Sequence, residues 1–259
     1  MTDERMNLVK PVLDTIENED IKEFAVALLD ELPEYIWTVP ASSTGKYHPA
    51  YSLGDGGLMR HQIAVVRFLN FFFELEQYGS KLTSREMDLM RVAGLVHDGM
   101  KSGTQEQFTK SKYTKFDHPI LMADKILECN GHLPTEELEL IASAISRHMG
   151  QWNTDKKSST VLPKPNEKFS RMLHVADYLA SRKSLTMDFD NYVAIAPKKV
   201  EWDENYVLSF GKHAGEKLID VYNCHPDYIE WMEGTINRRD VLDMIKAMKA
   251  HLKDNDKEQ

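Results

Sequence analysis

The chain of 259 residues lacks the features of secreted and membrane proteins. Its two cysteines, Cys129 and Cys224, exclude a disulfide framework and a thiolate metal site, and so few cysteines favour a reducing compartment. No apolar run approaches the roughly 20 residues that cross a bilayer. The acidic start, MTDERMNLVK, lacks the basic and apolar parts of a secretion signal. We therefore expect a cytoplasmic protein with no membrane partner.

An excess of positive charge is also absent. The chain has 32 Lys and Arg against 41 Asp and Glu, a formal net charge of −9. This excludes a protein that coats nucleic acid by charge alone, because such binding needs many cations. A nuclease is not excluded, because bound metal ions supply local positive charge. Residues 101–115 hold four lysines against Glu106 alone, so this segment is either ordinary solvated surface or the neighbour of a phosphate site.

Alternating strand patterns are absent before residue 200. Instead, apolar residues recur at helical spacing in several segments, the first of which has a possible break near Asn18. These segments are 7–31, 61–78, 84–99, 118–129, 134–149 and 168–183. Residues 39–57 and 151–167 are rich in polar and turn-forming residues and are predicted loops. The fold class is therefore mainly α.

The tail has a different composition. The segment VEWDENYVLSFGKHAGEKLIDV mixes β-branched and aromatic residues with Gly211 and Gly215, which favours a short hairpin. Helical patterns return at 226–233 and 238–252. We predict three parts, namely an N-terminal helical region and loop at 1–47, a helical domain at 48–185 and a small α+β module at 190–255.

Histidines and carboxylates fall on apolar helix faces. This holds for His61, for His97 with the adjacent Asp98, for His148, and for Asp177 within the run MLHVADYLA. Buried charged groups are rare unless they are paired or bound to metal. One core histidine is usually structural, but five or six such residues on separate helices indicate a metal site. Imidazole with carboxylate suits Mn, Fe, Co, Ni or Zn, and carboxylate also suits Mg.

Five segments together resemble the HD superfamily of metal-dependent phosphohydrolases. They are GGLMRHQ (56–62), AGLVHDGMK (93–101), DHP (117–119), ISRHMGQ (145–151) and LHVADYLASR (173–182). The family pattern H…HD…H…H…D is matched in order by His61, His97, Asp98, His118, His148 and Asp177. The matched stretch covers residues 48–183. The resemblance implies an HD-type helical bundle and a hydrolase that acts on phosphoester bonds.

The same resemblance implies a role for each matched residue. A first divalent ion would be held by His61, His97, Asp98 and Asp177. A second would be held by His118 and His148, with Asp98 shared, so two ions of undetermined identity are expected. The family form HDxxK is matched by HDGMK, which makes Asp98 and Lys101 catalytic and places Lys101 against a substrate phosphate. Alternatively, Lys101 is a helix C-terminal lysine stabilised by the helix dipole.

Three further residues are candidates for substrate binding. Arg147 and Arg182 adjoin site positions, where each can grip phosphate or form a surface ion pair. His48 precedes the GGL turn and resembles a histidine found before the first ligand in some relatives. It either contacts substrate or is an ordinary loop histidine.

Two looser resemblances bear on the substrate. The order GGLMRH, HDGMK, RHMGQW, LPKP and HVADYLASR is similar to the HD domain of bacterial 3′→5′ exoribonucleases. Residues 208–232 are similar to the C-terminal module of exodeoxyribonuclease X-like enzymes, with an FGKxxG turn followed by Asp227, Tyr228 and Trp231. In this module Lys212, Tyr228 and Trp231 either contact single strands or belong to the module's own core.

These observations favour a metal-dependent phosphodiesterase that hydrolyses nucleic acid. It would act as an exonuclease on single-stranded ends, through attack of a metal-activated water on phosphorus. One alternative is a phosphohydrolase of free nucleotides, such as a nucleotidase, dNTPase or cyclic-nucleotide phosphodiesterase, which the acidic net charge favours. Another is a non-catalytic binding module with a structural metal. The sequence does not distinguish RNA from DNA, and it leaves the oligomeric state open.

Overall fold

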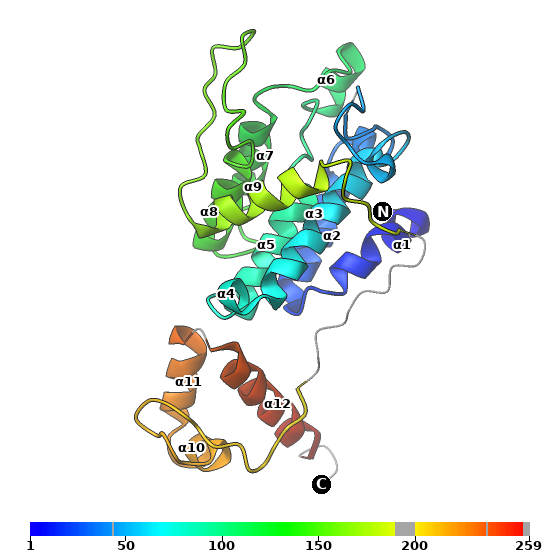
Figure 1. The fold of residues 1–259 in the computed structure, drawn as a ribbon. Coiled ribbons are helices and arrows are strands. Elements are labelled where there is room, and N and C mark those ends of the chain that lie inside the picture. Colours follow the sequence, from blue (N-terminus) through cyan, green and yellow to red (C-terminus); the bar gives the residue numbers. More distant parts are fainter. Residues whose placement is uncertain (43, 190–199, 237, 256–259) are drawn as a thin grey trace. The chain divides into compact units, whose positions relative to one another are not determined.

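The computed structural model describes residues 1–42, 44–189, 200–236 and 238–255, and the regular secondary structure of this part of the chain is helical (Figure 1). The described residues form no strand and contain only isolated β-bridges. The chain divides into two compact units, Met1–Phe72 with Arg85–Ala194, and Phe73–Ser84 with Ile195–Gln259. None of the described helices combines the length and apolar content that a bilayer crossing requires.

The helices up to residue 189 follow one another with two short 3-10 turns, η1 and η2. In chain order they are α1 (Asp3–Leu13), α2 (Glu19–Glu31), η1 (Glu34–Trp37), η2 (Ala50–Ser52), α3 (Gly57–Glu74), α4 (Glu76–Gly79), α5 (Ser84–Val96), α6 (Gln105–Lys110), α7 (His118–Glu128), α8 (Thr135–Ser146) and α9 (Lys168–Ala180). Each helix segment predicted from apolar spacing is present, with its ends shifted by a few residues. The break predicted near Asn18 separates α1 from α2.

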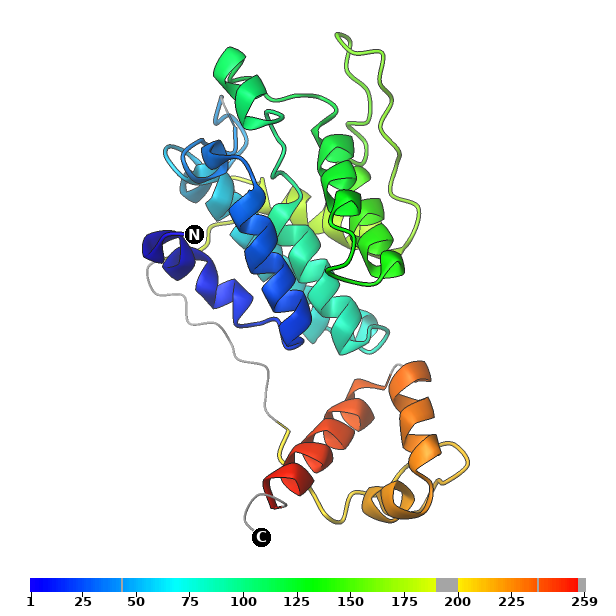
Figure 2. The same cartoon turned by 180° about the vertical axis from the view of Figure 1, so that it is seen from behind.

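The first unit is built around α5. Every residue of this helix from Met87 to Val96 is buried, so α5 is covered on all sides, mainly by its neighbours α2 and α3 (Figures 1 and 2). At Gly94 the two helices α3 and α5 approach closely, because a Cβ there would lie 2.8 Å from Leu69 Cδ1. This close approach is one turn before His97 and fixes the end of α5 against α3.

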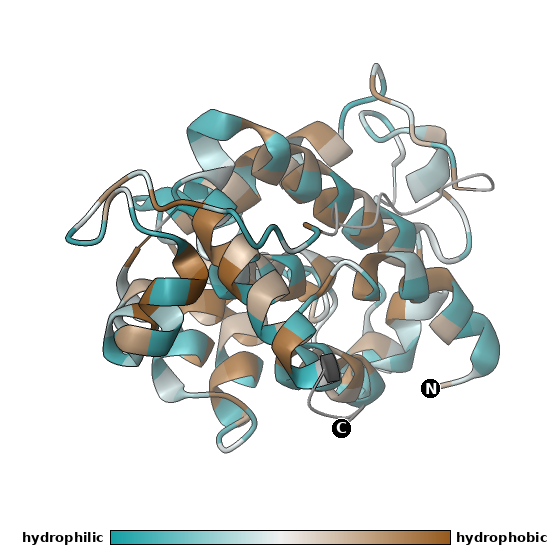
Figure 3. Ribbon diagram, turned by 90° about the horizontal axis from the view of Figure 1, so that it is seen from below, coloured by the Kyte–Doolittle hydropathy of each residue, from teal (hydrophilic) through white to brown (hydrophobic). Residues whose placement is uncertain are grey.

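Helices α8 and α9 show why the remaining segments fold as they do. The buried residues of α8 recur at helical spacing, from Leu138 to Ile145, and leave its outer face polar. Figure 3 shows the resulting bands of apolar and polar residues around the helices. A capping box between Glu167 and Ser170 begins α9. The helices are therefore ordinary amphipathic elements. The polar residues buried on their inner faces depart from this pattern and have a separate cause.

The C-terminal module, residues 200–255, is helical as well. Its helices are α10 (Leu218–Cys224), α11 (Pro226–Thr235) and α12 (Arg239–Asn255). They enclose a core made only of apolar side chains, namely Leu208, Leu218, Val221, Ile229, Met232, Val241, Met244, Ile245 and Met248.

The predicted α+β character of this module is not confirmed. The expected hairpin is reduced to one antiparallel bridge between Val207 and Lys217. Between them the chain turns at Gly211 and Gly215, both with positive φ, and residues 218–224 continue as helix. Of the β-branched residues of this segment, Val221 belongs to the module's core and Ile219 packs against it, whereas Val207 is exposed. The first ten residues of the predicted module, 190–199, lie outside the described residues.

Besides α10, a second helix was missed by the predictions. Residues 105–110 form α6 within the lysine-rich segment, and a capping box between Thr104 and Gln107 begins it. None of its residues is buried, so it has no apolar periodicity from which it could be recognised.

Candidate metal centre

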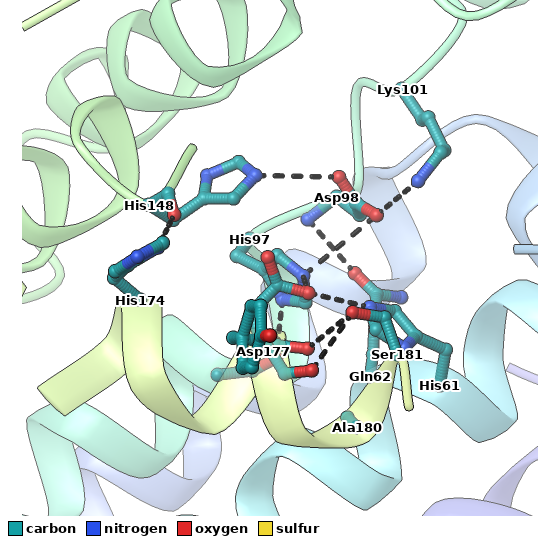
Figure 4. Close-up of polar contacts among 12 residues, drawn as sticks. His61, Gln62, His97, Asp98, Lys101, His148, His174, Asp177, Ala180 and Ser181 are labelled. Atoms are coloured by element: carbon teal, nitrogen blue, oxygen red, sulfur yellow. Dashed lines mark hydrogen bonds and ion pairs between the residues drawn. The ribbon is translucent and has the colours of Figure 1, made fainter. Parts of the chain in front are cut away.

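The structure brings all six predicted ligands together. Figure 4 labels five of them, all except His118. They come from five helices or helix ends of the first unit. His61 lies in the second turn of α3, His97 and Asp98 follow α5, His118 begins α7, His148 follows α8, and Asp177 lies in α9. Because they are spread over 117 positions, from 61 to 177, only the packing of the helices unites them.

One end of the cluster is formed around Asp177. Its Oδ1 lies 3.0 Å from His61 Nε2 and 3.7 Å from His97 Nε2. These three ligand atoms all lie within 4.8 Å of one another, a spacing that allows them to share one ion. His61 and His97 are buried, whereas 21% of the Asp177 side chain is exposed.

The other end is formed around Asp98, whose two oxygens face different partners. Asp98 Oδ1 lies 3.0 Å from His118 Nε2 and 3.7 Å from His148 Nε2. Asp98 Oδ2 lies 3.8 Å from His97 Nε2 and also accepts a hydrogen bond from Lys101 Nζ. His97, Asp98 and His148 form a second group with ligand atoms within 4.8 Å. Asp98 therefore lies between the two halves of the cluster.

Backbone carbonyls orient three of the rings. The Nδ1 atoms of His97, His118 and His148 lie 2.9, 2.6 and 2.8 Å from the carbonyl oxygens of Gly94, Lys115 and Ile145. A carbonyl only accepts, so each Nδ1 carries the proton and each Nε2 presents a lone pair to the cluster. This is the usual arrangement of ligating histidines, whose second nitrogen is held by an outer partner.

Several atoms that face the interior of the cluster have no hydrogen-bond partner. They are His97 Nε2, His118 Nε2 and Asp98 Oδ1, all buried. Leaving buried polar atoms unpaired costs about 1–3 kcal/mol each, so a native fold rarely retains a group of them without a ligand. The donor set of imidazole nitrogens and carboxylate oxygens suits divalent transition metals. The residues present therefore fit a metal site.

Both carboxylates are held ionised. Burial opposes the charge of Asp98, but the Lys101 ammonium and the neighbouring His97 and His118 rings hold its pKa well below the usual range. Burial likewise opposes the charge of Asp177, and the facing His61 and His97 rings hold its pKa well below normal. Anionic oxygens are thus ready to coordinate a cation at neutral pH.

Two of the histidines, His97 and His148, differ in the direction in which their surroundings shift the pKa. Burial lowers the pKa of His97, but the carboxylates of Asp98 and Asp177 outweigh it, so the net direction is upward. For His148, burial and the nearby His97 ring lower the pKa to about 3. His148 is therefore neutral under ordinary conditions, which is the ligating form.

Further residues support this cluster, and the sequence patterns did not indicate them. The buried Gln62 accepts a hydrogen bond from Asp98 N through its Oε1 at 3.3 Å. The buried Tyr35 accepts from Ser102 N and donates to Gly103 O, which fixes the chain just after Asp98. His174 donates from Nδ1 to His148 O at 2.7 Å. These bonds join residues far apart in sequence, so no local signal marks them.

The four predicted residues outside the ligand set occupy different surroundings. Lys101, with 15% of its side chain exposed, contacts Asp98 at the edge of the cluster. The ring of His48 lies 5.7 Å from that of His61, and burial lowers the pKa of His48 to about 4. Arg147 bonds back onto α8, through Ser143 and Ser146. Arg182 bonds to Tyr178 O and Ser181 Oγ on α9. Of the four, Lys101 and His48 adjoin the cluster.

Comparison with protein-family models assigns this region. Residues 59–182 match the HD domain, so the part of the chain that carries the cluster is an HD domain. HD domains are metal-dependent phosphohydrolases that bind divalent ions, and the His and Asp cluster is compatible with that class. The protein is accordingly an enzyme, a metal-dependent phosphohydrolase. No curated protein and no solved structure matched the chain.

Proposed function

We propose that this enzyme is a phosphodiesterase that hydrolyses nucleic acid from a single-stranded end. The observation that supports a polyanionic substrate is the charge of three segments that lead into the cluster. They are 38–56, 99–117 and 149–167, and we call them the rim segments. Together they hold eight lysines and five acidic residues, a net charge of +3, so the rest of the chain carries −12.

The rim segments are tied to the cluster by their ends. The first precedes α3 and includes His48, the second joins Asp98 to His118, and the third joins His148 to α9. Figures 1 and 2 show all three on the same side of the first unit. Positive charge is therefore concentrated on one side of the first unit, in a chain that is otherwise acidic. A nucleic-acid strand bound at the cluster would pass over the lysines of the rim segments.

Each rim segment also exposes an aromatic side chain. They are Tyr47, Tyr113 and Trp152, with exposed fractions of 58%, 79% and 44%. Lysines accompany all three, and Lys46 lies over the Tyr47 ring at 5.1 Å. Exposed aromatic rings interleaved with cations are typical of surfaces that bind single strands, because rings stack on unpaired bases.

We assign the ligands as follows. His61, His97, Asp98 and Asp177 hold one divalent ion, and His118 and His148 hold a second with Asp98 shared. The opposite orientation of the two Asp98 oxygens supports the shared role. Bound divalent ions lower the pKa of water and offset negative charge on phosphate. We assign Lys101 to a phosphate oxygen of the substrate, which its pairing with Asp98 at the edge of the cluster supports. We assign His48 to the substrate as well, which its position beside the His61 ring supports.

A free nucleotide is the second candidate substrate. The observations that favour it are the net charge of −9 and the burial of the cluster, where only Asp177 and Lys101 are appreciably exposed. A substrate as small as a nucleotide would bind at the cluster without contacting the rim segments.

The low cysteine content is the basis for predicting a cytoplasmic site of action.

The proposal is tested by offering the purified protein labelled single strands and a panel of nucleotides, each with Mn²⁺ or Mg²⁺. Stepwise release of mononucleotides is expected. Lys112→Glu, on a rim segment, should lower the slope of log KM against log salt by about one. Lys253→Glu is the matched control, because it makes the same charge change in the C-terminal module. Turnover of monomers only, or equal behaviour of the two variants, would contradict a nucleic-acid substrate.

A further inference from the structure

An aromatic stack lies beside the metal cluster and is not explained by it. The Trp152 ring is stacked on the Tyr178 ring, with centroids 5.8 Å apart and an interplanar angle of 13°. The guanidinium of Arg182 lies over the Tyr178 ring, 4.2 Å from its centroid. The stack joins a rim segment to α9. We call these three residues the stacking shelf.

The shelf is connected to the cluster through two short links. Tyr178 is the residue after Asp177 on α9. Trp152 makes an edge contact with the His174 ring, at 6.2 Å between centroids, and His174 bonds to the backbone carbonyl of His148. The shelf therefore adjoins Asp177 in sequence and is one ring removed from His148. Gly150 allows the His174 ring to lie close to the chain between His148 and Trp152, because a Cβ at position 150 would lie 2.2 Å from that ring. Its φ of 57° also favours glycine.

Packing alone does not account for the shelf. Trp152 leaves 44% of its surface exposed, and Tyr178 and Arg182 are only partly buried. Among the described residues no carboxylate lies within ion-pair distance of Arg182, whose guanidinium bonds only to Tyr178 O and Ser181 Oγ. The exposed indole of Trp152 and the partly exposed guanidinium of Arg182, both of which contact the Tyr178 ring, offer planar groups to solvent. A second planar group can extend such a stack.

We propose that Trp152, Tyr178 and Arg182 bind an unpaired nucleobase of the substrate, next to the phosphate at the cluster. The inference rests on the proposed function and adds how the substrate is recognised. Every base has a π-face, so stacking would tolerate any base sequence. Bases within a duplex have their faces covered, so the shelf selects unpaired ends. Arg182 adds attraction for the strand's phosphates.

The test measures binding in EDTA, so it does not depend on hydrolysis. A short fluorescein-labelled oligothymidylate is titrated with wild type, Trp152→Ala, Trp152→Phe and the control Val161→Ala. Val161 is exposed on the same rim segment and lies outside the shelf. Losing a base stack should weaken binding about 10-fold to 100-fold in Trp152→Ala. Trp152→Phe should recover most of the affinity, and Val161→Ala should match wild type.

An abasic strand separates stacking from a general effect of the substitution. On that strand wild type should bind as weakly as Trp152→Ala, which should show no additional loss. Equal affinities of wild type and Trp152→Ala for oligothymidylate would overturn the shelf but leave the proposed function standing, provided wild type hydrolyses the strand. Absence of both binding and hydrolysis by wild type would overturn both. If wild type hydrolyses nucleotides alone, a KM for nucleotides unchanged by Trp152→Ala would overturn the shelf.

Discussion

The two units of the molecule differ in the polar groups that they bury. The HD domain places buried imidazoles and two buried carboxylates among its apolar residues, and several of the imidazole and carboxylate atoms have no hydrogen-bond partner. The C-terminal module buries nine apolar residues, and its buried histidine, His213, lies within 3.1 Å of Glu216. Unpaired polar atoms reduce stability, so a fold that retains them gains something other than stability from them. The comparison teaches that the polar interior marks the functional unit, whereas the apolar interior of the module serves its folding.

The sharpest way to break this comparison is to substitute two buried aspartates of the same region. Asp98 faces the cluster, whereas Asp88 on α5 accepts bonds from the backbone of Glu17 and Asn18 and pairs with Arg91. We expect Asp88→Asn to lower the free energy of unfolding by about 3–5 kcal/mol, because it breaks a buried ion pair. Asp98→Asn should lower metal affinity and turnover at least ~100-fold.

Denaturant unfolding and metal analysis of both proteins check this prediction. Folded Asp88→Asn should retain the metal content of wild type. The comparison fails if Asp98→Asn binds metal as wild type does, or if Asp88→Asn loses metal while still folded.

A smaller effect is expected from the module's core. Ile229→Ala removes a fully buried side chain from the apolar cluster and should cost about 2–4 kcal/mol. Since the metal cluster lies in the other unit, metal content at a temperature where the HD domain is folded should equal that of wild type. Calorimetry with metal analysis measures both. Loss of metal in this variant would show that the interiors are not independent.

The smallest effect concerns the Tyr35 hydroxyl of the first unit, a buried polar group whose hydrogen bonds are satisfied. Burial raises the pKa of Tyr35 from 10.0 to about 12, because the fold binds the neutral phenol. The stability that this phenol contributes is complete below pH 10 and is lost as pH rises from 10 to 12. The expected loss is about 2 kcal/mol. The free energy of unfolding is measured across this pH range in wild type and in Tyr35→Phe. The difference between the two proteins isolates the effect, since they differ only in the phenolic hydroxyl of residue 35.

Much of the fold and site was predictable because the signals are local. The apolar spacing of α3, α5, α7, α8 and α9 predicted these helices. Histidines and carboxylates on their apolar faces indicated five of the candidate ligands, whereas His118 was added only by the resemblance to the HD superfamily. The contribution of Gln62 was not predictable, because its bond to Asp98 joins two helices and depends on packing. Nor was the pairing of Trp152 with Tyr178, since the residues lie on different segments.

The C-terminal module shows the limit of composition as a guide. The β-branched and aromatic residues in the segment 200–221 favoured a hairpin. Instead, Val221 lies in α10 and in the core of the module, and the aromatic residues Tyr206 and Phe210 pack against that core. Tertiary packing overrides weak β-propensity in such short segments. Tyr228 packs against the module's core, as one of the two interpretations has it. Trp231 is stacked on Tyr228 and remains 48% exposed, so a contact of Trp231 with single strands stays a prediction.

The carbonyl bonds of His97, His118 and His148 have an evolutionary consequence. In each case the acceptor is the residue three positions earlier, so every ring takes its orientation from its own turn of backbone. Insertions and deletions in the connecting segments leave those turns intact. Related proteins can therefore have longer or different connecting segments, and so admit different substrates, while the three imidazole rings keep the same orientation.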